Sequence, residues 1–185
     1  VRTTLLKKGI NLFSAQDFIN AFALSRELAN VKLSRYKKQG YLTSPKKGIY
    51  YFQDSPPDNF VLANRIYMPS YVSLEMILSK EGIIPESVYT ITSVTTKATR
   101  EFVDNGIAYS YSRIKREAYT GYYLANNAQI ATPEKALIDY LYFVSQGRKT
   151  LNDRITFLRI NKKECLEYAR LFDNKRLDNL VKKIF

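Results

Sequence analysis

The fold of the N-terminal part of the chain is indicated by residues 13–52, FSAQDFINAFALSRELANVKLSRYKKQGYLTSPKKGIYYF. Ser14 is a good N-cap residue, and Asp17 three positions later completes an approximate capping box, so a short helix begins there. Ser25 caps a longer second helix. This helix is expected to end at Gly40, because glycine best tolerates the left-handed conformation that follows a helix C-terminus.

A β-hairpin is expected directly after the second helix. Two short β-rich runs, YLTS and IYYF, are joined by a turn at residues 45–48, which contains Lys46 and Lys47. Two helices followed by a lysine-tipped hairpin are the parts of a winged helix-turn-helix, whose second helix can enter the major groove of DNA.

The second helix has one apolar face, formed at helical spacing by Ala29, Leu33 and Tyr36. On the polar face, Asn and Arg can read base edges, while the lysines of the wing meet phosphates. Leu28 and Val31 fit this outward face poorly, which leaves open that they pack on the hairpin. The candidate DNA-binding residues are Ser25, Arg26, Asn30, Ser34, Arg35, Lys37, Lys38, Lys46 and Lys47.

The net charge of +12 is concentrated at the two ends of the chain. Residues 1–52 carry ten Lys or Arg and two Asp or Glu, residues 53–147 carry eight and ten, and residues 148–185 carry eleven and five. A basic module beside a nearly neutral middle indicates a polyanionic partner, here double-stranded DNA. Two alternatives stay open: a solvated basic surface, and a winged helix that is used for protein contacts.

Residues 53–59, QDSPPDN, indicate a Pro-rich hinge between two domains, a winged helix-turn-helix in residues 1–53 and a larger domain in residues 58–185. In the larger domain we expect a helix capped by Ser73, a strand within residues 88–96 and further β-like pieces. The expected fold class is therefore α+β, with a small antiparallel sheet and C-terminal helices in the larger domain. The basic tail is either a second nucleic-acid surface or a solvated helical face.

The stretch ATPEKALIDYLYF, residues 131–143, predicts a helix that is either an active site or a structural fastener. Thr132 is a natural N-cap, Pro133 occupies the first helical position, and Lys135 and Asp139 can pair across one turn. A metal-dependent nuclease would need Glu-x-Lys or Asp-x-Lys on a strand, and the one Asp-x-Lys begins at Asp173 in a helical region. We therefore favour the fastener.

The chain contains no histidine, which excludes serine or cysteine nucleophiles activated by histidine and zinc sites of clustered Cys and His. We expect no enzyme activity, catalytic residue, metal or cofactor. The single Cys165 rules out an internal disulfide and is expected to be buried. No stretch approaches a membrane span and the start has no signal-peptide pattern, so we expect a cytoplasmic protein without a membrane partner.

Four motifs in order resemble the AbiEi family of bacterial antitoxins and transcriptional regulators. They are KKQGYL, KKGIY, YVSLEMILSKEGIIPE and ATPEKALIDYLY, and the similarity covers residues 13–143. The resemblance implies a winged helix that binds inverted repeats in the promoter of its own operon and represses it. It also implies a C-terminal domain that counters a nucleotidyltransferase toxin, in a type IV toxin–antitoxin system of abortive infection whose two proteins need not touch.

Two rival functions remain. One is a winged-helix regulator whose second domain senses a small ligand. The other is a Mg²⁺-dependent enzyme that processes nucleic acid, which the absent histidine and Glu-x-Lys disfavour.

Overall fold

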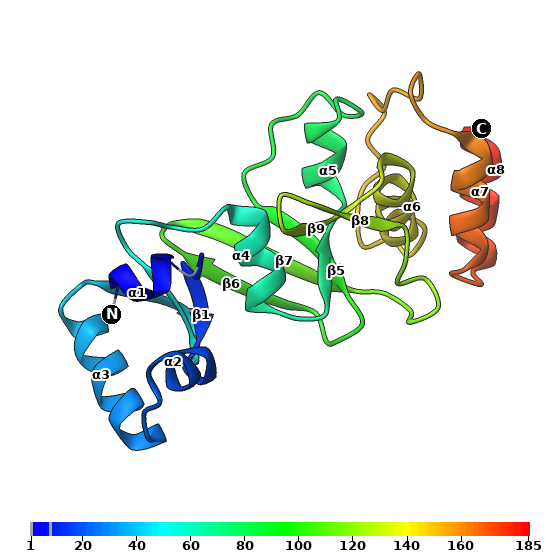
Figure 1. The fold of residues 1–185 in the computed structure, drawn as a ribbon. Coiled ribbons are helices and arrows are strands. Elements are labelled where there is room, and N and C mark those ends of the chain that lie inside the picture. The colour runs from blue at the N-terminus through cyan, green and yellow to red at the C-terminus, as the bar shows by residue number, and fades with distance from the viewer. Residues whose placement is uncertain (1, 8) are drawn as a thin grey trace. The chain divides into compact units, whose positions relative to one another are not determined.

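In the computed structural model, which describes residues 2–7 and 9–185, the chain divides into the units Val1–Ile66 (unit 1) and Tyr67–Phe185 (unit 2). Unit 1 contains four helices and three strands among the described residues (Figure 1). They are α1 (Arg2–Lys7), β1 (Leu12–Ser14), α2 (Ala15–Phe22), α3 (Arg26–Lys38), β2 (Leu42–Lys46), β3 (Ile49–Phe52) and α4 (Asn59–Ile66). The strands form an antiparallel sheet in the order β1-β3-β2.

The two caps predicted for the N-terminal helices are confirmed. The Ser14 hydroxyl accepts from the amide of Asp17, and the Asp17 carboxylate accepts from the amide of Ser14, which is a complete capping box at the start of α2. The Ser25 hydroxyl accepts from the amide of Leu28 at the start of α3. Satisfying these first amides fixes where each helix begins.

The hairpin differs from the predicted four-residue turn. Strand β2 continues through Pro45 to Lys46, which leaves only Lys47 and Gly48 in the turn. Pro45 is tolerated because β2 is an edge strand whose register is irregular between Thr43 and Lys46. Gly48 has φ +86°, a left-handed conformation that suits glycine in a tight hairpin.

Aromatic rings fill the core of unit 1. Phe13 from β1 lies between Phe18 of α2 and Phe52 of β3, with ring centroids 6.1 and 5.6 Å away. Ala29 and Leu33 bring α3 onto this cluster. The apolar face predicted for the second helix is therefore the one that packs inward.

Helix α4 was not predicted, and it lies beyond the boundary that the Pro-rich hinge suggested between residues 53 and 58. The Arg65 guanidinium forms an ion pair with Asp17 at 2.9 Å. The Lys46 ammonium donates to the carbonyl of Ile66 at 2.9 Å, at the C-terminal end of α4. These two contacts hold α4 within unit 1.

Unit 2 is built on a six-stranded mixed sheet, larger than the small antiparallel sheet expected from the sequence. Two pairings, β4 with β9 and β5 with β7, are parallel, and the strand order is β6-β7-β5-β4-β9-β8. The strands are β4 (Ser70–Val72), β5 (Ile91–Thr95), β6 (Arg100–Asp104), β7 (Ile107–Arg113), β8 (Tyr122–Ala125) and β9 (Ala128–Ala131). The mixed α+β class is thus confirmed, but the antiparallel sheet is wrong.

Four described helices accompany this sheet, and α6, α7 and α8 pack on one another (Figure 1). They are α5 (Glu75–Lys80), α6 (Pro133–Ser145), α7 (Lys162–Arg170) and α8 (Lys175–Ile184). Thr132 caps α6 as predicted. Ser73 does not cap α5: Leu74 is the N-cap, and the Ser73 hydroxyl donates to Asp139 instead. In the tail, Leu177 and Val181 are buried, whereas Leu171 is 37% exposed.

Candidate nucleic-acid interface

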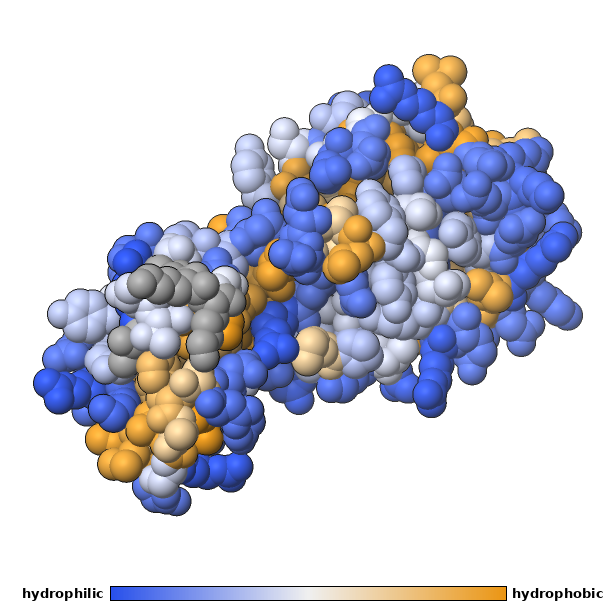
Figure 2. All heavy atoms as spheres, viewed as in Figure 1, coloured by the Kyte–Doolittle hydropathy of each residue, from blue (hydrophilic) through white to orange (hydrophobic). Residues whose placement is uncertain are grey.

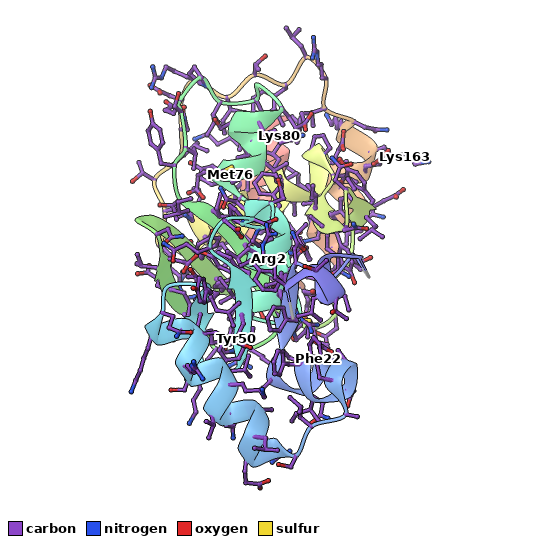
Figure 3. All side chains as sticks on the ribbon, turned by 60° about the vertical axis from the view of Figure 1, so that its left-hand side comes forward. Arg2, Phe22, Tyr50, Met76, Lys80 and Lys163 are labelled. Carbon is purple, nitrogen blue, oxygen red and sulfur yellow. The ribbon has the colours of Figure 1, made fainter. Side chains whose placement is uncertain are left out.

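Helix α3 presents a polar face to solvent. Ala29 and Leu33 are buried and Tyr36 is half-buried, which places the remaining side chains of the helix outward. All seven residues that the sequence predicted on this helix and its cap are exposed: Ser25, Arg26, Asn30, Ser34, Arg35, Lys37 and Lys38. Side chains project freely from the outer side of α3 (Figure 3).

Leu28 and Val31 do not pack on the hairpin, which corrects one possibility left open by the sequence. Their side chains are 55% and 66% exposed, and both belong to the exposed large apolar residues of the described chain. Apolar atoms gather on the surface of unit 1 where α2 and α3 meet, with polar side chains around them (Figure 2). The outer face of α3 therefore combines apolar and basic groups.

The two hairpin lysines are placed differently. Lys47 is exposed at the turn. Lys46 is half-buried, and its ammonium is held by the Ile66 carbonyl. Sequence alone assigned both to phosphates, whereas the structure leaves Lys47 the more accessible cation.

A groove runs between α3 and the hairpin. It brings together five of the nine predicted residues, Asn30, Ser34 and Lys37 from α3 with Lys46 and Lys47 from the hairpin. Ser25, Arg26, Arg35 and Lys38 are exposed but do not line it.

Sequence reasoning missed two polar side chains of this groove, Ser44 and Tyr50. Tyr50 lies on β3 and packs on Phe13, with ring centroids 6.1 Å apart (Figure 3). The β-alternation of IYYF could have separated the buried Tyr51 from the half-buried Tyr50.

The charge of the groove has one sign. Its described lining contains three lysines and no aspartate or glutamate. A groove with hydroxyl, amide and ammonium groups and no carboxylate can hold a polyanion, and Ser and Asn can donate to phosphate or base atoms.

The predicted pair on α6 lies deep inside unit 2. Lys135 and Asp139 form an ion pair, and both side chains are 0% exposed. The second oxygen of Asp139 accepts from the hydroxyls of Tyr71 at 3.0 Å and Ser73 at 2.8 Å. The Lys135 ammonium also lies 4.9 Å from the ring centroid of Phe172.

Burial sets the protonation properties of this pair. Loss of solvent lowers the pKa of Lys135 and raises the pKa of Asp139, while the attraction between the two groups opposes both shifts. Neither side chain of the pair is exposed to solvent. The pair ties α6 to β4, which is the arrangement expected of a fastener.

Among residues 2–7 and 9–185 there is no group of three or more His, Cys, Asp or Glu placed to hold a metal ion. Cys165 is buried as predicted, and burial raises the pKa of its thiol to about 12. No helix in the described part of the chain combines the length and hydropathy needed to cross a membrane. Comparison with known proteins found neither a matching family model nor a matching curated sequence.

Proposed function

We propose that the chain is a DNA-binding antitoxin and transcriptional autorepressor, in which unit 1 is a winged helix-turn-helix. Helix α3 would be the recognition helix and the β2–β3 hairpin the wing. The observation that carries the proposal is the groove in which Asn30, Ser34 and Lys37 face the hairpin lysines without a carboxylate. The element order of unit 1, with two capped helices before an antiparallel hairpin, supports it.

In this proposal each group has a distinct task on DNA. Arg26, Asn30, Ser34 and Arg35 reach base edges or phosphates from α3, because they are exposed on a helix whose opposite face is buried. Lys37, Lys38 and Lys47 neutralise phosphates, which contributes affinity independent of sequence. The bound DNA would be the inverted repeats upstream of the chain's own gene.

The antitoxin half of the proposal rests on the resemblance of residues 13–143 to the AbiEi family. Unit 2 would counter a nucleotidyltransferase toxin without a required contact between the two proteins. The buried pair of Lys135 and Asp139 then maintains the fold of unit 2 and takes no part in chemistry. We propose no enzyme activity and a cytoplasmic location for the protein.

A salt titration tests the DNA half. The 185-residue chain is titrated with the DNA upstream of its gene and with scrambled DNA at several salt concentrations. The Lys37→Ala/Lys47→Ala double variant should bind both DNAs more weakly. The slope of the logarithm of its binding constant against the logarithm of the salt concentration should fall in magnitude by about two, because two phosphate contacts are lost.

Lys163→Ala supplies the control, because Lys163 is an exposed lysine of α7 in unit 2 (Figure 3). It should bind like the unaltered chain. If Lys163→Ala weakens binding and the double variant does not, the basic tail is the nucleic-acid surface and the proposed groove is wrong.

A further inference from the structure

Unit 2 contains an open cleft of about 1120 Å³. Its walls come from the segments that follow β5 and β7 and from the C-terminal end of α6. Small-molecule sites commonly measure roughly 300–1,000 Å³, so the cleft is large enough for a ligand of nucleotide size.

Cations dominate the lining of this cleft. Arg113, Lys115 and Arg116 come from the segment at the end of β7, Arg148 follows α6, and Glu117 is the one acidic residue of the described lining. Among the described residues, the Lys115 ammonium donates to the carbonyl of Asp173 at 3.2 Å.

None of the three arginines forms an ion pair with any described residue, and all three are exposed. Guanidinium groups bind phosphate through paired hydrogen bonds. The arginines are therefore free to take a phosphorylated ligand.

Two polar atoms in the same cleft are buried without a hydrogen-bond partner among the described residues. They are the hydroxyl oxygen of Tyr119 and the side-chain amide oxygen of Gln146. Buried polar atoms are paired in the large majority of cases, so two orphans in one cleft need an explanation.

The position of Tyr119 is fixed by its neighbours. Its ring packs on Tyr71 and Tyr122, with centroids 5.1 and 5.3 Å away, which sets the direction of the hydroxyl. Burial raises the pKa of Tyr119, so the group stays protonated and can donate. The Gln146 amide offers an acceptor, or a donor when it is rotated by 180°.

We propose that this cleft binds a small phosphorylated molecule of nucleotide size, with its phosphates on Arg113, Arg116 and Arg148 and its other polar groups on Tyr119 and Gln146. The site lies wholly in unit 2 and does not depend on DNA binding by unit 1. It goes beyond the proposed function, because it gives unit 2 a ligand.

Calorimetric titration of the full chain at about 0.15 M salt, where exposed charges are screened beyond roughly 8 Å, tests the proposal. The probes are inorganic pyrophosphate, the four ribonucleoside triphosphates and the four nucleosides. At least one triphosphate should bind, pyrophosphate should bind more weakly, and the nucleosides should show no heat. Failure of every probe to bind overturns the proposal.

Arginine variants test the location of the site. Arg148→Ala should weaken triphosphate binding at least tenfold. Arg159→Ala removes another exposed arginine of unit 2, outside the cleft, and should leave binding unchanged. Equal weakening by both variants would mean that net charge alone attracts the probe, and the cleft would not be the site.

Two tyrosine variants separate binding from folding. Tyr119→Phe should weaken triphosphate binding about fivefold and leave the melting temperature of the free protein unchanged or higher, because its hydroxyl has no hydrogen-bond partner in the part of the chain that the structure describes. Tyr140→Phe should leave triphosphate binding unchanged and lower the melting temperature, because the Tyr140 hydroxyl donates to the carbonyl of Thr150 and accepts from the amide of Asn152. The opposite pattern contradicts the proposal.

A single-stranded RNA 12-mer serves as the macromolecular probe. If it binds in a manner that requires Arg148 while no triphosphate binds, the cleft recognises nucleic acid and the small-molecule proposal fails. Duplex binding that depends on Lys37 and Lys47 is measured separately, so that either proposal can fail without the other.

Discussion

Lys135 and Asp139 form an ion pair on α6 in which neither side chain is exposed to solvent. Two charges lose their hydration when they are buried, and their attraction offsets that loss only when the remaining hydrogen-bonding capacity is used. Here Tyr71 and Ser73 donate to Asp139 from β4 and the residue that follows it. The pair therefore links α6 to residues that lie 68 and 66 positions earlier in the sequence.

Asp139→Ala should strongly destabilise unit 2. It leaves the Lys135 ammonium buried without a counter-charge and the Tyr71 and Ser73 hydroxyls without an acceptor, a change that costs about 3–5 kcal/mol in comparable buried pairs. Urea unfolding of the full chain measures this loss. Lys135→Met/Asp139→Leu removes both charges and should cost less than Asp139→Ala alone. A loss under about 1 kcal/mol for Asp139→Ala would contradict a fastener role.

Gly121→Ala should destabilise unit 2 by more than Gly147→Ala. Both glycines have a left-handed φ, +73° and +70°, so both variants carry backbone strain of about 1–2 kcal/mol. At Gly121 an added Cβ would also lie 2.8 Å from the ring of Tyr168 and 2.9 Å from the Cγ of Lys135, whereas at Gly147 it meets nothing. The difference in melting temperature between the two variants measures the cost of the steric clash at Gly121. Equal losses of stability would show that the Tyr168 ring moves aside.

Local signals predicted much of the secondary structure. Ser14, Ser25 and Thr132 cap their helices as expected, because capping involves residues within one turn. The sheet of unit 2 was underestimated, because its parallel pairings join segments distant in sequence. Strand β5 is buried along its whole length, as expected of a strand in the middle of a sheet that is covered on both faces. From the sequence we instead expected an antiparallel sheet, in which buried and exposed residues commonly alternate.

The candidate interface was also predictable in part from local sequence signals. The apolar spacing of Ala29, Leu33 and Tyr36 fixes which face of α3 is exposed, and that face holds the predicted polar residues. The contact from Lys46 to Ile66 spans 20 residues and depends on α4, a helix that was not predicted although the Asp58 carboxylate accepts from its first amides, those of Phe60 and Val61. The burial of Lys135 and Asp139 was equally hidden, because pairs four residues apart are usually solvated.

Asp17→Asn should make the stability of unit 1 less sensitive to acid. Burial alone would raise the pKa of Asp17, but hydrogen bonds from Ser14 and the nearby Arg65 guanidinium outweigh it and hold the pKa below its ordinary value of 3.8. A lowered pKa in the folded state contributes stability that is present above pH 3.8 and is lost as the pH falls through the folded value.

Circular dichroism in urea at pH 6, 4 and 3 measures this dependence. The unaltered chain should lose stability more steeply below pH 4 than Asp17→Asn does. Arg65→Met removes one source of the lowered pKa and should give an intermediate slope. Identical slopes for all three proteins would show that Asp17 titrates normally in the folded state.

Lys46→Ala and Lys47→Ala should have different effects, although the residues are adjacent. Lys46→Ala removes a charged donor from the Ile66 carbonyl and should lower the stability of unit 1 by about 1–3 kcal/mol. Lys47→Ala should leave stability unchanged, because the side chain is exposed, and should reduce the salt slope of DNA binding by about one contact. Melting curves and salt titrations of both variants distinguish these roles. Equal loss of stability would contradict the division between a structural Lys46 and an exposed Lys47 at the hairpin turn.

The exposed apolar pair on α3 provides the last test. Leu28→Ser and Val31→Ser should change the stability of the chain by less than about 0.5 kcal/mol, because each side chain is more than half exposed. If α3 enters the major groove as proposed, both should weaken binding to the upstream DNA more than to scrambled DNA, since apolar side chains can contact thymine methyl groups there. Leu158→Ser is the control, because Leu158 is 95% exposed in unit 2. Preserved discrimination between the two DNAs in both α3 variants would place recognition on another surface.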